Sequence, residues 1–245
     1  MLQESKGTVL FDSLLTGGKG EYAMPRHPRN SQSDHLHLIV RGVGKQILFE
    51  CEADYCFYLG ILRQYSNECN IRIYAYCLMS NHVHLLVYDP EGNVSVFMKK
   101  MGVSYAGHYN RKYERTGHLF QDRFLSEPIR NEKHLLIVFR YILNNPHKAG
   151  ICPASLYKWS SYSHYGKREA LADTSLICEL LGDYKEYEAF IRMGNNDRCM
   201  EYESYRNDDE WARDTLRSCL GTSNGSVLKS LGKEERNNYI RLLKN

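Results

Sequence analysis

At 245 residues the chain is long enough to bury one hydrophobic core, with at most a small appendage. Its hydrophobic content of 42% and charged content of 25% are ordinary for a globular protein. No stretch approaches the ~18 apolar residues that a membrane-spanning helix needs, and no N-terminal apolar run resembles a signal peptide. These features exclude a transmembrane helix and predict a cytoplasmic protein.

The net charge of +3 is small, but the charges are unevenly distributed. Residues 94–130 carry seven Lys/Arg against three Asp/Glu, whereas residues 166–210 carry six against twelve. We therefore expect a polyanion to dock on the basic first half. The 8 cysteines show no CxxC pair, and those in mostly apolar contexts, which predict buried free thiols, are Cys56, Cys69, Cys77 and Cys178.

The first half of the chain shows clear secondary-structure patterns. Residues 1–24 are weakly patterned and predict a poorly ordered leader. Residues 35–41 alternate and predict a strand, and residues 52–70 carry a helical apolar repeat. Residues 71–88 then predict a hairpin with its turn at residues 79–81. Residues 94–113 predict a second helix.

A further strand and helix follow. Residues 117–130 predict a turn and then a strand that includes Arg123 and Arg130. Asn131 is typical of a helix N-cap, and we expect the helix to run to about Asn144, stopped by Pro146. Its expected core stripe is Leu135, Val138 or Phe139, and Ile142, and its other side carries Tyr141, Asn145 and Lys148.

This order of elements predicts an α+β fold, with a ferredoxin-like antiparallel sheet and helices on its faces. After residue 150 an aromatic, serine-rich connector leads into short helices separated by acidic linkers. Among these we predict helices at residues 208–220 and 233–243. The C-terminal part is therefore expected to be a small helical appendage.

The most informative chemical pattern is His82-Val83-His84 in the second arm of the predicted hairpin. The two-residue period of a strand places both imidazoles on one face and Val83 on the other. Such a pair is either a hydrogen-bonded structural pair or a partial metal site. Leu86 and Val87 exclude the patterns in which further ligands follow at once, so a third ligand must come from a distant segment.

Two other patterns have both a structural and a functional interpretation. His35 and His37 form a second alternating pair on the first predicted strand. A neighbouring strand of this kind can support the first pair without binding an ion. A tyrosine stripe at four-residue spacing lies in the 94–113 helix among basic residues. It favours core packing over a platform for stacked bases. The stripe is Tyr105, Tyr109 and Tyr113.

Three motifs in order carry a resemblance to a known family. They are AYCLMSNHVH at residues 75–84, RTGHLFQDRF at 115–124 and RYILNNPHKAG at 140–150. Together they resemble the single-tyrosine HUH transposases of the insertion-sequence-200/605 type, and within these the REP-associated tyrosine transposase branch. The resemblance covers roughly residues 25–165, which we expect to be the catalytic domain.

We expect residues 166–245 to form a helical C-terminal region. Its last part, residues 208–245, resembles the segment that leads into an additional helix-turn-helix in some members of the family. The chain is therefore expected to stop where the recognition half would begin.

The resemblance implies a metal-dependent enzyme that nicks and rejoins single-stranded DNA beside short hairpins. Carried over by position, Tyr141 is the nucleophile that forms a 5′-phosphotyrosine intermediate. His82 and His84 are metal ligands, and Asn145 is the third ligand of a Mg²⁺ or Mn²⁺ ion that acts as a Lewis acid on the scissile phosphate. The spacing of Tyr141 and Asn145 places both on one face of a helix.

Several alternatives remain open in the sequence. Asn144 or Gln121 could replace Asn145, and the tyrosines of the 94–113 helix are competing nucleophiles. The family includes enzymes that act alone and homodimers that exchange the tyrosine helix. A non-catalytic or regulatory nucleic-acid-binding protein derived from such a transposase is a second functional class. A replication-initiator or relaxase-type HUH nuclease is a third, although the order of the motifs favours the transposase.

Single-stranded DNA with hairpin ends is the expected partner, and we place it on the basic 94–130 region. Arg123 and Arg130 are candidate phosphate contacts, or else solvated strand residues. The full set of expected DNA contacts is Lys99, Lys100, Arg111, Lys112, Arg115, Arg123 and Arg130.

Overall fold

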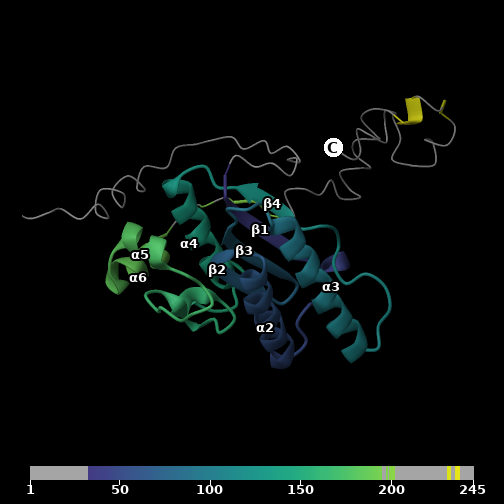
Figure 1. The fold of residues 1–245 in the computed structure, drawn as a ribbon, viewed down its shortest axis with the longest axis horizontal. Coiled ribbons are helices and arrows are strands. Elements are labelled where there is room, and N and C mark those ends of the chain that lie inside the picture. Colours follow the sequence, from purple (N-terminus) through teal and green to yellow (C-terminus); the bar gives the residue numbers. More distant parts are fainter. Residues whose placement is uncertain (1–32, 195–196, 198, 202–230, 233–234, 238–245) are drawn as a thin grey trace, which may run out of the picture. The chain divides into compact units, whose positions relative to one another are not determined.

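The computed structural model describes residues 33–194, 197, 199–201, 231–232 and 235–237 (Figure 1). The leader predicted at residues 1–24 and the helix predicted at 208–220 lie outside the described residues, as does most of the helix predicted at 233–243. The chain divides into two compact units, residues 1–200 and 201–245. Within the second unit, residues 235–237 are helical and the amide of Arg236 donates to the carbonyl of Gly232.

The first unit is an α+β fold built on a four-stranded antiparallel sheet in the order β2-β3-β1-β4. The β-α-β-β-α-β succession with this strand order is the predicted ferredoxin-like arrangement, and the prediction is confirmed. The elements are β1 (His35–Arg41), α2 (Glu52–Glu68), β2 (Arg72–Met79), β3 (His82–Tyr88), α3 (Val94–Lys112), β4 (Leu125–Pro128), α4 (Glu132–Lys148), α5 (Ser175–Leu181) and α6 (Tyr184–Arg192). Three short 3₁₀ turns are η1 (Val43–Lys45), η2 (Ala154–Leu156) and η3 (Ser161–His164).

Helices cover both faces of the sheet. Helices α2 and α3 pack on one face, and α4 packs on the other with α5 and α6 behind it (Figure 1). Alternation along β3 divides its side chains between the two cores. Val83 and Leu85 join the core under α2 and α3, whereas Leu86 joins the core under α4. His82 and His84 share the face of Leu86, so they lie on the α4 side.

The tyrosine stripe of α3 belongs to the core, as the sequence favours. Tyr105 and Tyr109 are buried, and their hydroxyls donate to the backbone carbonyls of Leu48 and Ile47. Tyr113 is half-buried and donates to the carboxylate of Asp54 over 2.7 Å. These rings hold α3 against the chain before α2 and are not an open platform for bases.

Helix α4 begins as predicted but ends later. The side chain of Asn131 accepts a hydrogen bond from the amide of His134 over 2.8 Å, which confirms it as the N-cap. The prediction that Pro146 stops the helix is wrong, because α4 continues to Lys148. Pro146 removes one donor in the last turn, but the amide of Ala149 still bonds to the carbonyl of Asn145 over 2.9 Å.

Two smaller predictions also need correction. Strand β4 pairs with residues 36–39 of β1 alone, so Arg123 and Arg130 flank this strand instead of lying in it. The seven cysteines that the structure describes are free, and Cys69 and Cys77 are buried as predicted. Cys56 is exposed, because it lies off the face of α2 that packs into the core.

Within the described part of the chain, no helix combines the length and apolarity needed to cross a membrane.

Candidate active site

The two histidines of the His82-Val83-His84 motif (the HUH histidines) lie on the central strand β3 and face α4. His84 is buried and His82 is partly exposed. Their ring centroids are 5.0 Å apart, and the rings stand nearly perpendicular at 84°. Because β3 is paired on both sides, by β2 and β1, its backbone holds the two imidazoles rigidly.

Each of these imidazoles uses its Nδ1 atom within the protein. Nδ1 of His84 lies 3.1 Å from Nε2 of His37, and Nδ1 of His82 lies 2.7 Å from Oδ1 of Asn81. In the ring of His84, Nε2 is the remaining nitrogen. Burial lowers the pKa of His84 well below its usual value, and the neighbouring His82, His37 and Lys148 lower it further. His84 is therefore neutral, which is the form of histidine that binds metal ions.

Helix α4 brings Tyr141 to these histidines and carries two further polar side chains on the same face. The ring of Tyr141 contacts the ring of His84 edge-on, with 5.7 Å between the centroids. One turn later Asn145 is buried, and its Nδ2 donates to the carbonyl of Tyr141 over 3.0 Å, so Oδ1 is its remaining polar atom. One turn further on, Nζ of Lys148 lies 4.2 Å from the centroid of the Tyr141 ring. The i, i+4, i+7 spacing thus gathers a phenol, a carboxamide and an ammonium group on one face.

The available donors fit a divalent ion. Two imidazole nitrogens and one carboxamide oxygen form a mixed nitrogen–oxygen set, which leaves positions for phosphate oxygens and water. Among the described residues, no group of three or more His, Cys, Asp and Glu side chains is placed to hold a metal. The third protein ligand that the resemblance implies is Asn145, whose carboxamide lies on the face of α4 that carries Tyr141. The alternative Asn144 is used elsewhere, since its Nδ2 donates to the carbonyl of Ile191 in α6.

Sequence reasoning did not find Glu127, a buried carboxylate beside this site. Glu127 lies on β4 directly opposite His37 on β1. Its two oxygens lie 3.6 Å from Nδ1 of His37 and 3.6 Å from Nε2 of His134. Burial opposes its ionisation, but His37 and His134 together hold the pKa of Glu127 below its usual value. No pattern in the sequence around Glu127 marks it as a site residue, because its position opposite His37 depends on how β4 pairs with β1.

Comparison with known proteins identifies the family. Residues 34–145 match the family model described as "Transposase IS200 like". Residues 34–145 therefore form an IS200-like transposase domain. The matched segment runs from the start of β1 to Asn145, so it contains both histidines, Tyr141 and Asn145. No match was found among curated proteins.

Two solved structures are similar to this chain. A REP-associated tyrosine transposase bound to a REP hairpin has 16% sequence identity and a TM-score of 0.49, and the likeness covers 60% of this chain and 84% of that one. A candidate transposase from Deinococcus radiodurans R1 has 21% identity and a TM-score of 0.34, and the likeness covers 49% of this chain and 97% of that one.

The structure does not bring the basic residues of α3 to His82 and His84. Helix α3 packs on the opposite face of the sheet. Lys100 pairs with Glu68 over 2.8 Å, Lys112 pairs with Asp54 over 2.6 Å, and the guanidinium of Arg115 lies over the ring of Tyr109. Lys99 and Arg111 also belong to α3. Arg123 and Arg130, by contrast, flank the edge strand β4.

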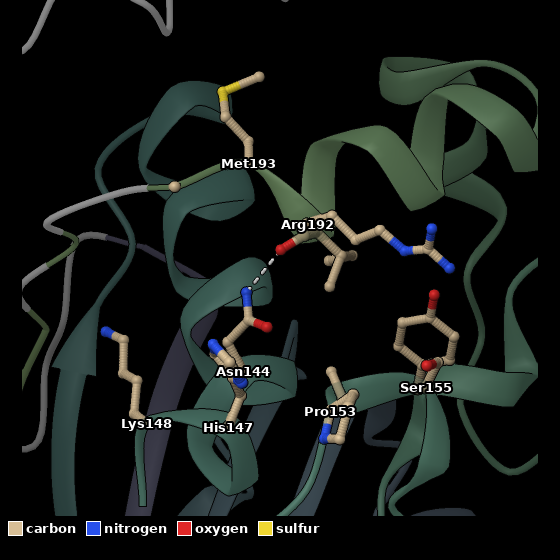
Figure 2. Close-up of a pocket in the computed structure, with 11 residues that line it drawn as sticks. Asn144, His147, Lys148, Pro153, Ser155, Arg192 and Met193 are labelled. Atoms are coloured by element: carbon tan, nitrogen blue, oxygen red, sulfur yellow. Dashed lines mark hydrogen bonds between the residues drawn. The ribbon is translucent and has the colours of Figure 1, made fainter. Parts of the chain in front are cut away.

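A pocket of about 310 Å³ lies at the C-terminal end of α4. Figure 2 shows Asn144 reaching towards α6, with its hydrogen bond to the carbonyl of Ile191, while Pro153 and Ser155 form another wall. Among the described residues, Lys148 lines the pocket. The two histidines of β3 do not line it, and neither do Tyr141 and Asn145. Lys148 therefore lies between this pocket and the tyrosine.

Proposed function

We propose that this IS200-like transposase nicks and rejoins hairpin-bearing single-stranded DNA in the cytoplasm, through a phosphotyrosine intermediate at Tyr141. The observation that carries this proposal is the edge-on contact between Tyr141 on α4 and His84 on β3. It places a phenol beside the imidazole pair although the two segments are remote in the sequence.

The proposed reaction needs little beyond this arrangement. The phenolic oxygen of Tyr141 attacks the scissile phosphorus, and the bond from phosphorus to the 3′ oxygen breaks. The phenol gives its proton to solvent, and the leaving oxygen takes one to become a free 3′-OH. Attack by a different 3′-OH on the phosphotyrosine reverses these steps and joins new strands. The covalent link preserves the phosphodiester energy, so no external energy source is required.

His82, His84 and Asn145 are the residues that would hold a divalent Mg²⁺ or Mn²⁺ ion. When bound, the ion would supply Lewis-acid polarisation of the phosphate oxygens. Lys148 adds a fixed positive charge beside the Tyr141 ring, where it would stabilise negative charge that develops on the phosphate during attack. The protein thus supplies the nucleophile, its orientation and one cation from a single helix.

The experiment is a covalent-trapping assay. The full chain is incubated with end-labelled, hairpin-bearing single-stranded oligonucleotides and Mg²⁺ or Mn²⁺, and the products are separated on a denaturing gel. We expect a protein–DNA adduct with the wild type and none with Tyr141→Phe. Tyr109→Phe is the matched control, because Tyr109 is a competing tyrosine buried on the opposite face of the sheet. This variant should retain the adduct.

Three other results would redirect the proposal. An adduct that persists in Tyr141→Phe would assign the nucleophile to another residue. Hairpin binding by the wild type without any adduct would favour the non-catalytic regulatory class. Cleavage with no covalent link would indicate an ordinary metal-dependent phosphohydrolase.

A further inference from the structure

Three side chains from neighbouring strands form a row beneath Tyr141. Glu127 on β4 lies directly opposite His37 on β1, and His37 reaches diagonally across to His84 on β3. The strand register explains the row, since Leu86 is the partner of His37 and the partner of His84 is Ile39. All three members of the row are at least 96% buried, so they face one another in the absence of bulk solvent.

The contact between the two histidines requires one donor and one acceptor. Nε2 of His37 and Nδ1 of His84 are 3.1 Å apart, which is a hydrogen-bond distance. A neutral imidazole carries a proton on one nitrogen and a lone pair on the other. Two arrangements of the protons are therefore available. If Nδ1 of His84 donates, Nε2 of His84 keeps a lone pair. If Nδ1 of His84 accepts, Nε2 of His84 carries a proton.

The charge of Glu127 selects between these arrangements. Its Oε2 lies 3.6 Å from Nδ1 of His37, slightly longer than a hydrogen bond but close enough for a strong electrostatic interaction in a buried site. A proton on Nδ1 of His37 is attracted to the carboxylate, whereas a lone pair there is repelled. With the proton on Nδ1, Nε2 of His37 accepts, Nδ1 of His84 donates, and Nε2 of His84 keeps its lone pair.

Two further contacts hold Glu127 in its ionised form. The amide of Met200 donates to Oε2 over 3.3 Å. Nδ1 of His134 accepts a hydrogen bond from the amide of Arg130, so the proton of the neutral His134 ring lies on Nε2. This Nε2 atom faces Oε1 of Glu127. The carboxylate is thus surrounded by donors, which favours its negative charge.

We propose that Glu127 and His37 are positioning residues that fix His84 in the tautomer able to bind a divalent cation through Nε2. This inference rests on the proposed function, because it takes His84 as a metal ligand. It extends that function from the residues that contact the ion to a carboxylate–imidazole–imidazole row that orients one of them. His35, the other member of the second histidine pair, instead packs against the rings of Tyr74 and Tyr88.

The first test observes the tautomer directly in the metal-free protein. Long-range ¹H–¹⁵N correlation spectra of the full chain, labelled at histidine with ¹⁵N, report which ring nitrogen carries the proton. We expect His84 to carry it on Nδ1 in the wild type. Glu127→Gln keeps the shape but removes the charge, and we expect it to shift His84 towards the Nε2–H form. His108→Gln, which changes a histidine on α3, should leave the His84 signals unchanged.

The second test measures the affinity for Mn²⁺ alone, by electron paramagnetic resonance of the free ion. Loss of a residue that orients a ligand typically weakens metal binding by about 10- to 100-fold. We expect a loss of at least about 10-fold for Glu127→Gln and for His37→Leu. His37→Gln keeps an oxygen that can accept from Nδ1 of His84, so it should recover part of the affinity. His108→Gln should bind Mn²⁺ like the wild type.

The outcomes separate this inference from the proposed function. An Nε2–H tautomer of His84 in the wild type would overturn the inference, as would an unchanged Mn²⁺ affinity in folded Glu127→Gln. If His37→Leu fails to fold, the wild-type spectrum and Glu127→Gln still decide the question. Neither test uses DNA. Failure of the covalent-trapping assay would therefore remove the proposed reaction without affecting these two results.

Discussion

The ring of Tyr141 contacts the ring of His84 edge-on at a centroid distance of 5.7 Å. This contact joins a helix and a strand that are separated in the sequence by α3 and β4. It is held from both sides, because α4 lies between the sheet and α6, where Asn144 bonds to the carbonyl of Ile191 over 2.8 Å. The position of Tyr141 relative to the imidazole pair therefore depends on the stability of α4, which can be tested at several points.

The N-cap of α4 should contribute measurably to stability. Asn131→Ala removes the acceptor for the amide of His134, and we expect the free energy of unfolding to fall by about 1 kcal/mol. Urea denaturation measures the change. Asn131→Asp keeps a capping oxygen and should remain close to the wild type. Equal losses in both variants would show that the cap is not the cause.

A buried ion pair should stabilise α4 more strongly. Nε and Nη2 of Arg140 lie 2.7 and 2.9 Å from the carboxylate oxygens of Asp197. Arg140→Met leaves that carboxylate buried without its partner, so we expect a loss of about 3 kcal/mol in the free energy of unfolding. The double variant with Asp197→Asn should recover part of it. Arg192→Met, which breaks an exposed pair with Glu188, should cost less than about 1 kcal/mol.

The carboxylate of Asp54 should make stability depend on acid pH. Burial alone would raise its pKa, but hydrogen bonds from Lys112, Tyr113 and the amides of Cys51 and Glu50 lower it to about 2. A group whose pKa is lowered by folding stabilises the fold above its unfolded pKa, and this stabilisation is lost as the pH falls through the folded value. We therefore expect the stability difference between wild type and Asp54→Asn to be constant near neutral pH. It should shrink between about pH 4 and pH 2. A difference that stays constant down to pH 2 would contradict this assignment.

DNA binding should depend on arginines beside β4 more than on lysines of α3. Arg130 is exposed next to the N-terminus of α4, on the element that carries Tyr141. We expect Arg130→Ala to weaken binding of a hairpin oligonucleotide and to reduce the slope of log K against log salt by about 1. Lys100→Ala is the matched control, since Lys100 pairs with Glu68 on the opposite side of the sheet. An equal effect in both variants would place the DNA along α3.

Local features were predictable from the sequence. The limits of β1, the hairpin of β2 and β3 and the N-cap at Asn131 all depend on neighbouring residues, and each was predicted correctly. The placement of both HUH histidines on one face followed from the period of a strand. Even the buried stripe of tyrosines on α3 could be anticipated from its four-residue spacing.

Non-local features could not be predicted. The pairing of β4 with β1 places Glu127 opposite His37, and no pattern within either segment fixes that register. The continuation of α4 past Pro146 depends on the packing around its last turn, which outweighs the loss of one backbone donor. The bond between His37 and His84 likewise arises from a diagonal contact between two strands.

The most direct test of the account is to map the covalent adduct. The wild type would be reacted with a hairpin-bearing oligonucleotide and Mn²⁺, digested with protease and nuclease, and analysed by mass spectrometry for a peptide that retains a nucleotide. The account predicts a nucleotide attached to the peptide that contains Tyr141, linked through a 5′ phosphate. Attachment to Tyr105, Tyr109 or Tyr113, or a link through a 3′ phosphate, would contradict it.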